Sequence, residues 1–168
     1  MSRRSTVWRG LPATARGAAF ALVVTAAAGL GVRVGAAHAA TPSPLGLWRT
    51  VDDDSGQPKA LVRITEQGGA LQGRIERLLD PADPPDALCT QCPDQRRNQP
   101  IVGLAILRGL PRTPGADGNW SGGEILDPED GRTYRVRLAP SPDGRRLEVR
   151  GYLGVPMFGR SQTWQRVE

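Results

Sequence analysis

Histidine is almost absent from this sequence, and its scarcity limits the chemistry that the chain can perform. The one histidine, His38, lies among the first 39 of 168 residues. Ser-His-Asp catalysis, Cys-His catalysis and histidine-ligated zinc sites all need an imidazole side chain. We therefore expect no enzymatic activity, no cofactor and no metal site in the part of the chain that follows residue 39.

Acidic residues are absent from the same N-terminal segment, so the net positive charge is concentrated there. The whole chain has 22 Lys+Arg and 17 Asp+Glu, a formal net charge of +5. The excess comes from the arginines of residues 1–39, which are Arg3, Arg4, Arg9, Arg16 and Arg33. Beyond residue 39 the acids and bases balance. Because a neutral domain lacks the basic surplus that binding to phosphates needs, we expect no nucleic-acid partner.

The sequence also lacks an apolar run of the length typical of a membrane span. Its longest candidate, residues 17–32, falls short of the roughly 20 apolar residues that cross a bilayer. Basic residues precede this run and the small residues Ala37-His38-Ala39 follow it, a pattern typical of a secretory signal peptide. The sequence predicts a signal peptide over residues 1–39, a mature domain over residues 40–168, and a location in the periplasm or outside the cell.

Two alternatives for the N-terminal segment remain open. The apolar run could stay uncleaved and anchor the protein in a membrane. Ser2-Arg3-Arg4 followed by an alanine-rich run also resembles a twin-arginine export signal, which would imply export in the folded state. After cleavage we expect no stable membrane span.

Cysteine is scarce as well, with Cys89 and Cys92 as the only two. Export to an oxidising compartment favours a bond between them. Their spacing also occurs in redox enzymes and in half of a zinc ribbon, but residues 80–86 and 93–100 on either side have the composition of loops. A redox pair needs a helix to depress a thiol pKa. We therefore predict a structural disulfide that pins a loop and stabilises the fold by roughly 2 kcal/mol.

Helical periodicity is lacking beyond residue 39, and turn-forming clusters rich in Asp, Gly and Pro recur instead. Short segments in which apolar and polar residues alternate lie between these clusters, which is typical of strands. The predicted strands cover residues 45–51, 59–66, 70–79, 101–107, 120–126, 132–138, 145–153 and 160–167. We predict an all-β domain that forms an antiparallel up-and-down barrel of about eight strands, since closure removes exposed sheet edges.

One motif at each end of this domain is similar to a known pattern. Gly46-Leu47-Trp48, with Arg160 or Arg166 beside Trp164, resembles the glycine-x-tryptophan and arginine pair of the lipocalin or calycin superfamily. The resemblance implies that Trp48 plugs the closed end of a lipocalin-like barrel. It also implies that a late arginine lies across its ring, a cation–π contact of roughly 0.5–2 kcal/mol. Alternatively, Trp48 and Trp164 line a ligand cavity.

A longer set of motifs covers residues 45–168. It comprises Gly46-Leu47-Trp48-Arg49-Thr50, Cys89-Thr90-Gln91-Cys92, Gly103-Leu104-Ala105-Ile106-Leu107-Arg108-Gly109-Leu110, Gly123-Glu124-Ile125-Leu126-Asp127-Pro128, Val149-Arg150-Gly151-Tyr152 and Phe158-Gly159-Arg160-Ser161-Gln162-Thr163-Trp164. Together these motifs resemble the exported bacterial proteins grouped as domain of unknown function 2147. The resemblance implies a lipocalin-like barrel in an exported protein and leaves the function open.

Arginine supplies every base beyond residue 39 except Lys59, and it suits bidentate recognition of carboxylate or phosphate. Arginines that point inward would hold the head group of a fatty acid or another amphiphile. Alternatively, they form a solvated outer face paired with acids such as Glu124 and Glu148. The candidate ligand-binding residues are Trp48, Tyr134, Arg135, Arg137, Arg150 and Tyr152.

The acidic clusters predict no site. Residues 52–56 lack the spacing of a calcium-binding EF-hand loop, and Asp127-Pro128-Glu129-Asp130-Gly131 has the composition of a hairpin turn. Glu76, Glu124 and Glu148 are conceivable members of a glycoside-cleaving pair, but nothing in the sequence selects two of them.

Three functions remain as hypotheses, and the preferred one is an exported protein that binds a small, partly apolar or lipid-like ligand in its barrel. The second is a structural or interaction module with a side-chain-filled barrel, which acts through its surface and the loop of residues 80–100 on an unidentified protein partner. The least favoured is an enzyme that uses carboxylates or the cysteine pair.

Overall fold

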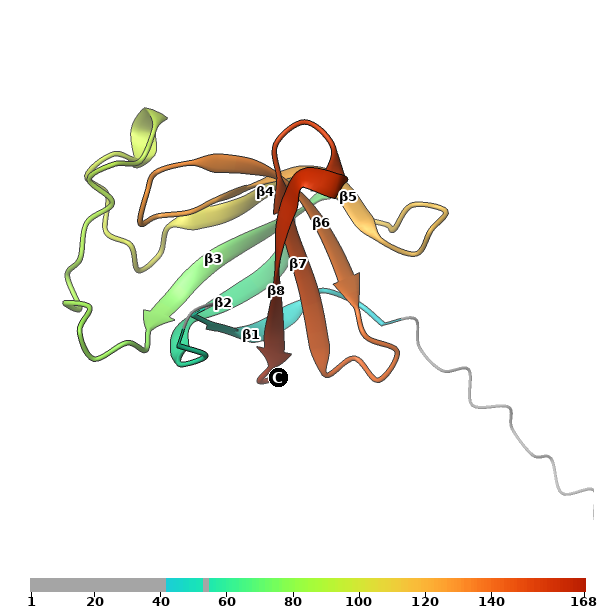
Figure 1. Ribbon diagram of the computed structural model, residues 1–168, viewed down its shortest axis with the longest axis horizontal. Helices are drawn as coiled ribbons and strands as arrows, with labels where there is room; N and C mark the ends of the chain where they lie inside the picture. The colour runs from blue at the N-terminus through green and yellow to red at the C-terminus, as the bar shows by residue number, and fades with distance from the viewer. Residues whose placement is uncertain (1–41, 53–54) are drawn as a thin grey trace, which may run out of the picture. The chain divides into compact units, whose positions relative to one another are not determined.

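The computed structural model describes residues 42–52 and 55–168, which Figure 1 shows as a barrel of antiparallel strands. The predicted signal peptide, residues 1–39, lies outside the described residues. In the described part, eight strands pair in chain order and β8 pairs back with β1. They are β1 (Gly46–Val51), β2 (Pro58–Gln67), β3 (Ala70–Leu78), β4 (Ala105–Pro111), β5 (Trp120–Leu126), β6 (Thr133–Pro140), β7 (Arg146–Tyr152) and β8 (Gly159–Arg166). The predicted all-β barrel of about eight strands is confirmed.

Apolar and polar residues alternate along the strands, and the apolar ones form the core of the barrel. In β6, Val136 and Leu138 are fully buried, whereas Arg135 beside them is exposed. In β7, Leu147 and Val149 are buried, whereas Arg146 and Glu148 are exposed. Successive side chains of a strand point to opposite faces, so this period of two places one apolar set inside the barrel. Each buried side chain of this size contributes roughly 1.5–3 kcal/mol.

The fourth strand is displaced along the chain from its predicted position, so the prediction of a strand over residues 101–107 was wrong in its bounds. Residues 101–104 form a turn, in which Leu104 N donates to Ile101 O at 3.1 Å. The strand itself begins at Ala105 and continues to Pro111. Leu104 is nevertheless buried. The apolar character of this run therefore comes partly from a turn packed on the core, which apolarity alone does not distinguish from a strand.

One end of the barrel is closed by an indole and a guanidinium. Trp48, on β1, is fully buried, and its Nε1 donates to Pro44 O at 2.7 Å. The Cζ atom of Arg166, on β8, lies 4.1 Å from the centroid of the Trp48 ring. Arg166 also donates to Leu45 O at 2.7 Å, to Ser43 O at 2.6 Å and to Gly144 O. One side chain thus joins the segment before β1, the turn before β7 and the last strand.

Gly46 makes room for this arrangement. Its φ of 123° lies in a region that residues with a side chain rarely adopt, and a Cβ there would lie 2.6 Å from Arg166 Nη1. The same Cβ would lie 2.5 Å from Glu168 O, so a larger residue at this position would displace both the arginine and the backbone of Glu168.

Helical structure in the described residues is limited to two short 3-10 turns, η1 (Asp94–Arg96) and η2 (Pro156–Phe158). No helix in residues 42–52 or 55–168 has the length and apolarity that crossing a membrane requires.

We predict that Arg166→Lys lowers the free energy of unfolding by about 1–3 kcal/mol, because lysine keeps the charge but lacks the planar fork that reaches several carbonyls at once. Urea unfolding followed by far-UV circular dichroism measures this. Arg146→Lys, at an exposed position on β7, is the matched control and should change little. Equal losses in the two variants would contradict the role of Arg166.

Candidate functional site

The open end of the barrel contains a cavity of about 610 Å³. It lies at the strand ends remote from Trp48, where β1, β3, β5 and β7 finish. Its inner wall is apolar and includes Val62, Ile75, Ile106, Ile125, Val149 and Trp164. Its rim is mostly charged and includes Asp52, Lys59, Asp83, Asp127, Glu129, Asp130, Arg132 and Arg160. The cavity therefore combines an apolar interior with a polar entrance.

The tryptophans of the first and last strands occupy different parts of the barrel interior. Trp48 does not line the cavity, whereas Trp164 does and is only 2% exposed. The indole of Trp164 donates to Gln162 Oε1 at 3.2 Å, and Gln162 also lines the cavity. Trp48 thus fills the closed end, and Trp164 contributes to the wall of the space above it.

The turn from β5 to β6 forms one side of the rim through its own hydrogen bonds. Asp127 N donates to Arg132 O at 2.8 Å, and Asp127 Oδ1 accepts from Glu129 N at 2.9 Å. Asp130 Oδ1 accepts from Arg132 N at 2.8 Å. Such contacts are why aspartate favours turns. The predicted hairpin turn is therefore present, and the same residues line the cavity.

The predicted disulfide between Cys89 and Cys92 is confirmed, and it holds the long β3–β4 connection against that turn. Cys89 Sγ lies 3.3 Å from Pro128 O, and Gln91 Nε2 donates to Glu129 O at 3.2 Å. Gly131, at a φ of 70°, faces the disulfide loop so closely that a Cβ there would overlap the carbonyl of Gln91. The disulfide therefore supports the rim of the cavity.

Lys59 joins the β1–β2 and β5–β6 sides of the rim. Its Nζ forms an ion pair with Glu129 and lies 3.7 Å from Asp52 Oδ2. Burial lowers the pKa of Lys59, but the hydrogen bond to Glu129 and the charges of Glu129, Asp52 and Asp127 outweigh it, so the pKa is raised. Lys59 is therefore cationic at neutral pH. No three or more Asp, Glu, Cys or His side chains in the described part of the chain are placed to hold a metal ion.

Asp127 is the acid of the rim whose ionisation the fold opposes. Burial raises its pKa, and the charges of Asp130 and Glu129 raise it further, against the hydrogen bond from Glu129 N and the charge of Lys59. A carboxyl group in this position resists ionisation because the charged form loses hydration. The rim thus carries an acid that a cationic or hydrogen-bonding ligand group would favour in its ionised form.

The β7–β8 connection adds an apolar lip to the mouth. Phe158 lines the cavity yet is 77% exposed, and Leu153 and Met157 beside it are also exposed. Arg150 fixes this connection from outside the barrel, since its Nε donates to Pro156 O at 2.7 Å and its Nη1 to Ser161 Oγ at 2.8 Å. The mouth of the cavity thus carries exposed apolar surface beside its charged rim.

The candidate ligand-binding residues fall into two groups. Tyr134 and Tyr152 line the cavity, and Tyr134 Oη lies 3.4 Å from Asp130 Oδ2. Arg135, Arg137 and Arg150 do not line it. Arg135 is exposed and Arg137 Nη2 pairs with Asp117 at 3.6 Å, as expected for an outer face. The alternation of β6 explains the separation, because Arg135 and Arg137 lie one residue out of phase with the buried set.

The residues considered for the plug separate in the same way. Gly46, Trp48 and Arg166 meet at the closed end, while Trp164 and Arg160 line the cavity. Strand direction accounts for this, because β8 runs from the open end at Gly159 to the closed end at Arg166. Of the two arginines that the motif left open, Arg166 is the one over the indole.

Several rim residues were missed as site residues. Lys59 stood out in the sequence as the lone lysine beyond residue 39, and Asp127, Glu129 and Asp130 were assigned to a turn. The scarcity of lysine was the available signal for Lys59. For the acids no signal distinguished a turn at a cavity mouth from a turn elsewhere.

The fold and its cavity define a lipocalin-like barrel. The structure is similar to that of "Protein HP1028 from the human pathogen Helicobacter pylori", which is described as belonging to the lipocalin family. The two share 23% sequence identity at a TM-score of 0.64, over 76% of this chain and 85% of the other. At this identity the likeness shows the fold alone.

The sequence itself assigns the family. Residues 46–166 match the model of the family described as "Uncharacterized protein conserved in bacteria (DUF2147)", and the chain belongs to this family. A search of curated proteins found no match.

We predict that Asp127→Asn gains stability relative to the unaltered protein as the pH rises. The raised pKa means that the protonated side chain of Asp127 stabilises the fold. This contribution is fully present below the ordinary aspartate pKa of 3.8 and is lost as the pH rises through the higher pKa of the folded state. Asparagine does not ionise and still accepts the hydrogen bond from Glu129 N. Urea unfolding between pH 3 and pH 7 measures the difference.

The exposed Asp86→Asn serves as the control for this comparison. If the stability of Asp127→Asn relative to the unaltered protein stays constant with pH, or falls as pH rises, burial does not oppose ionisation of Asp127.

Proposed function

We propose that this protein binds a small, partly apolar molecule in its barrel cavity and catalyses no reaction on it. The observation that carries the proposal is the cavity of about 610 Å³ at the open end. Ligand pockets of proteins are typically about 300–1,000 Å³, with mostly apolar walls and a few polar groups. The absence of histidine beyond residue 38 supports binding without catalysis.

The packing of the barrel supports this function over a side-chain-filled module. In the closed half, Trp48 and Ile64 are essentially inaccessible to solvent. Towards the open end, the small residues Gly151 and Ala60 line the cavity among larger apolar side chains. These small residues, on β2 and β7, leave part of the space that a ligand would occupy.

The charge of the rim favours some ligands over others. Its acids, Asp52, Asp83, Asp127, Glu129 and Asp130, outnumber its bases, Lys59, Arg132 and Arg160. An anionic head group at this mouth would meet more repulsion than attraction. We therefore propose a ligand whose polar end is neutral or cationic, which differs from the fatty acid considered from the sequence.

Export is part of the proposal. The signal-peptide pattern of residues 1–39 would send the protein to the periplasm or out of the cell, and the Cys89–Cys92 disulfide is compatible with either location. In such a compartment a barrel of this kind would sequester or carry a sparingly soluble molecule.

Gly151→Leu tests the cavity directly. Gly151 lines the cavity, and a Cβ there would make ordinary contacts, at 3.5 Å from Tyr134 Cβ and 3.7 Å from Ile125 Cγ2. Leucine would thus be tolerated by the strand and would fill the cavity. We predict at least about tenfold weaker binding of the neutral dye Nile red, measured by fluorescence titration, since the ligand would lose its space and contacts.

Thr163→Leu is the matched control, because Thr163 is exposed on β8 and gains similar bulk outside the barrel. Its binding of Nile red should equal that of the unaltered protein. If the unaltered protein binds no dye and carries no copurified small molecule in native mass spectrometry, the proposal fails and the interaction module with its loop of residues 80–100 gains support.

The preference for a head group has its own test. We predict that dodecylamine displaces bound Nile red at lower concentrations than dodecanoate, because the two have equal apolar length and differ in the sign of their charge. The difference should shrink at high salt, as rim charges become screened. A stronger effect of dodecanoate at low salt would refute the proposed preference while leaving the cavity as the binding site.

A further inference from the structure

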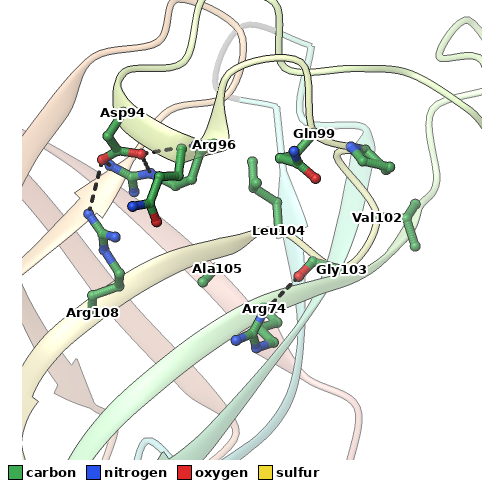
Figure 2. Close-up of a pocket in the computed structure, with 11 residues that line it drawn as sticks. Arg74, Asp94, Arg96, Gln99, Val102, Gly103, Leu104, Ala105 and Arg108 are labelled. Atoms are coloured by element: carbon green, nitrogen blue, oxygen red, sulfur yellow. Dashed lines mark hydrogen bonds and ion pairs between the residues drawn. The ribbon is translucent and has the colours of Figure 1, made fainter.

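A second concavity, of about 640 Å³, lies on the outer surface of the barrel, between strands β3 and β4 and the loop that carries η1 (Figure 2). It is separate from the barrel cavity, and the two share no lining residue. Its lining includes Arg74, Asp94, Arg96, Gln99, Val102 and Arg108. Three guanidinium groups from different parts of the chain thus face one pocket that contains a single carboxylate.

Arg96 is the unusual member of this set. Its side chain is only 9% exposed, and Asp94 binds one edge of its guanidinium: Nε donates to Asp94 Oδ1 at 3.0 Å and Nη2 to Asp94 Oδ2 at 2.9 Å. Its other terminal nitrogen, Nη1, is buried and has no hydrogen-bond partner among the described residues. Buried donors are rarely left unpaired, because the lost hydration is not replaced. Nη1 is therefore a donor without an acceptor in a residue that lines the pocket.

Asp94, which binds Arg96, has a backbone conformation that is unfavourable for most residues. Its φ is 57°, in the left-handed region, and its Oδ1 also accepts from Arg96 N at 3.0 Å. The hydrogen bonds from Arg96 lower the pKa of Asp94, and the charges of Arg96 and Arg108 lower it further. Asp94 therefore stays ionised and orients Arg96 over a wide pH range.

The other two arginines leave positive charge at the pocket. Arg74, on β3, donates through Nη1 to Gly103 O at 3.0 Å, a neutral acceptor (Figure 2). Arg108, on β4, pairs with Glu124 at 2.6 Å and lies 3.5 Å from Asp94 Oδ2. The carboxylates of Asp94 and Glu124 do not balance the charges of the three arginines. An anion with several oxygens would complete the arrangement.

Hydrogen bonds between the two disulfide cysteines and residues 97–99 fix one wall of the pocket. Arg97 Nε donates to Cys92 O at 3.2 Å, Asn98 N to Cys89 O at 2.9 Å and Cys89 N to Gln99 O at 2.9 Å. The half-exposed Val102 and the buried Leu104 add apolar surface beside the arginines. The pocket is thus held in place before any ligand arrives, and it offers apolar contact as well as charge.

We propose that this outer pocket binds a small organic oxyanion, a carboxylate or a phosphate monoester, with Arg74, Arg96 and Arg108 as its donors. Guanidinium groups suit such oxygens because they donate two parallel hydrogen bonds. The apolar part of the ligand would lie against Val102 and Leu104. The site does not depend on the barrel cavity, so the protein would bind two chemically different small molecules on opposite sides of one wall.

Nuclear magnetic resonance titration of the ¹⁵N-labelled purified protein tests this proposal with two probes, ethyl phosphate and propanoate. Saturable shifts of the amides of Gln99 and Gly103 are expected with at least one probe, and which probe acts separates the phosphate class from the carboxylate class. Arg74→Gln should weaken binding about tenfold, the loss expected for one charge-assisted contact. Arg108→Gln provides a second variant at another side of the pocket.

Arg135→Gln is the matched control, because it removes the same charge from an exposed position outside the pocket. It should leave the affinity within about twofold. The proposal is overturned if neither probe shifts these amides, if the shifts instead centre on the rim of the barrel cavity, or if Arg135→Gln weakens binding as much as Arg74→Gln does. Nile red uptake reports on the barrel cavity separately, so failure of one site is distinguishable from failure of the other.

Discussion

Closure of the barrel between its first and last strands is the constraint on which the rest of the structure depends. The β1–β8 pairing is short, and Arg166 reinforces it by covering the indole of Trp48 and donating to carbonyls of the segment before β1. Because these contacts gather at one end, that end is filled and the other is left wide. The position of the cavity follows from this asymmetry.

The β3–β4 connection, residues 79–104, which contains the disulfide, links the two proposed sites. On one side it rests against the β5–β6 turn, through Gln91 and the carbonyl of Glu129, and so supports the rim of the cavity. On its other side it carries Asp94 and Arg96, which form the outer pocket. A bond that closes so short a ring adds only roughly 2 kcal/mol through chain entropy. Its larger effect in this structure is to fix the position of a long loop.

Local pattern was enough to predict the strands. The alternation of Tyr134, Val136 and Leu138 with arginines indicated which face of β6 is buried. The plug by Trp48 was implied by the resemblance of Gly46-Leu47-Trp48 to the lipocalin motif. The bounds of β4 were wrong because a buried turn and a buried strand are equally apolar. The rim was missed because Asp127 and Glu129 have the composition of an ordinary turn. The sequence of a turn does not indicate which residues lie opposite it across the barrel.

The sequence by itself determined the class of fold and the disulfide, because each of these depends on neighbours along the chain or on a short motif. Only the tertiary structure decided that Lys59 meets Glu129, that Arg160 lies at the opposite end from Arg166, and that Arg74 and Arg96 share a pocket. These groups come from segments far apart in the chain. Their meeting is set by strand register and by the path of the loops, which depend on the packing of the whole barrel.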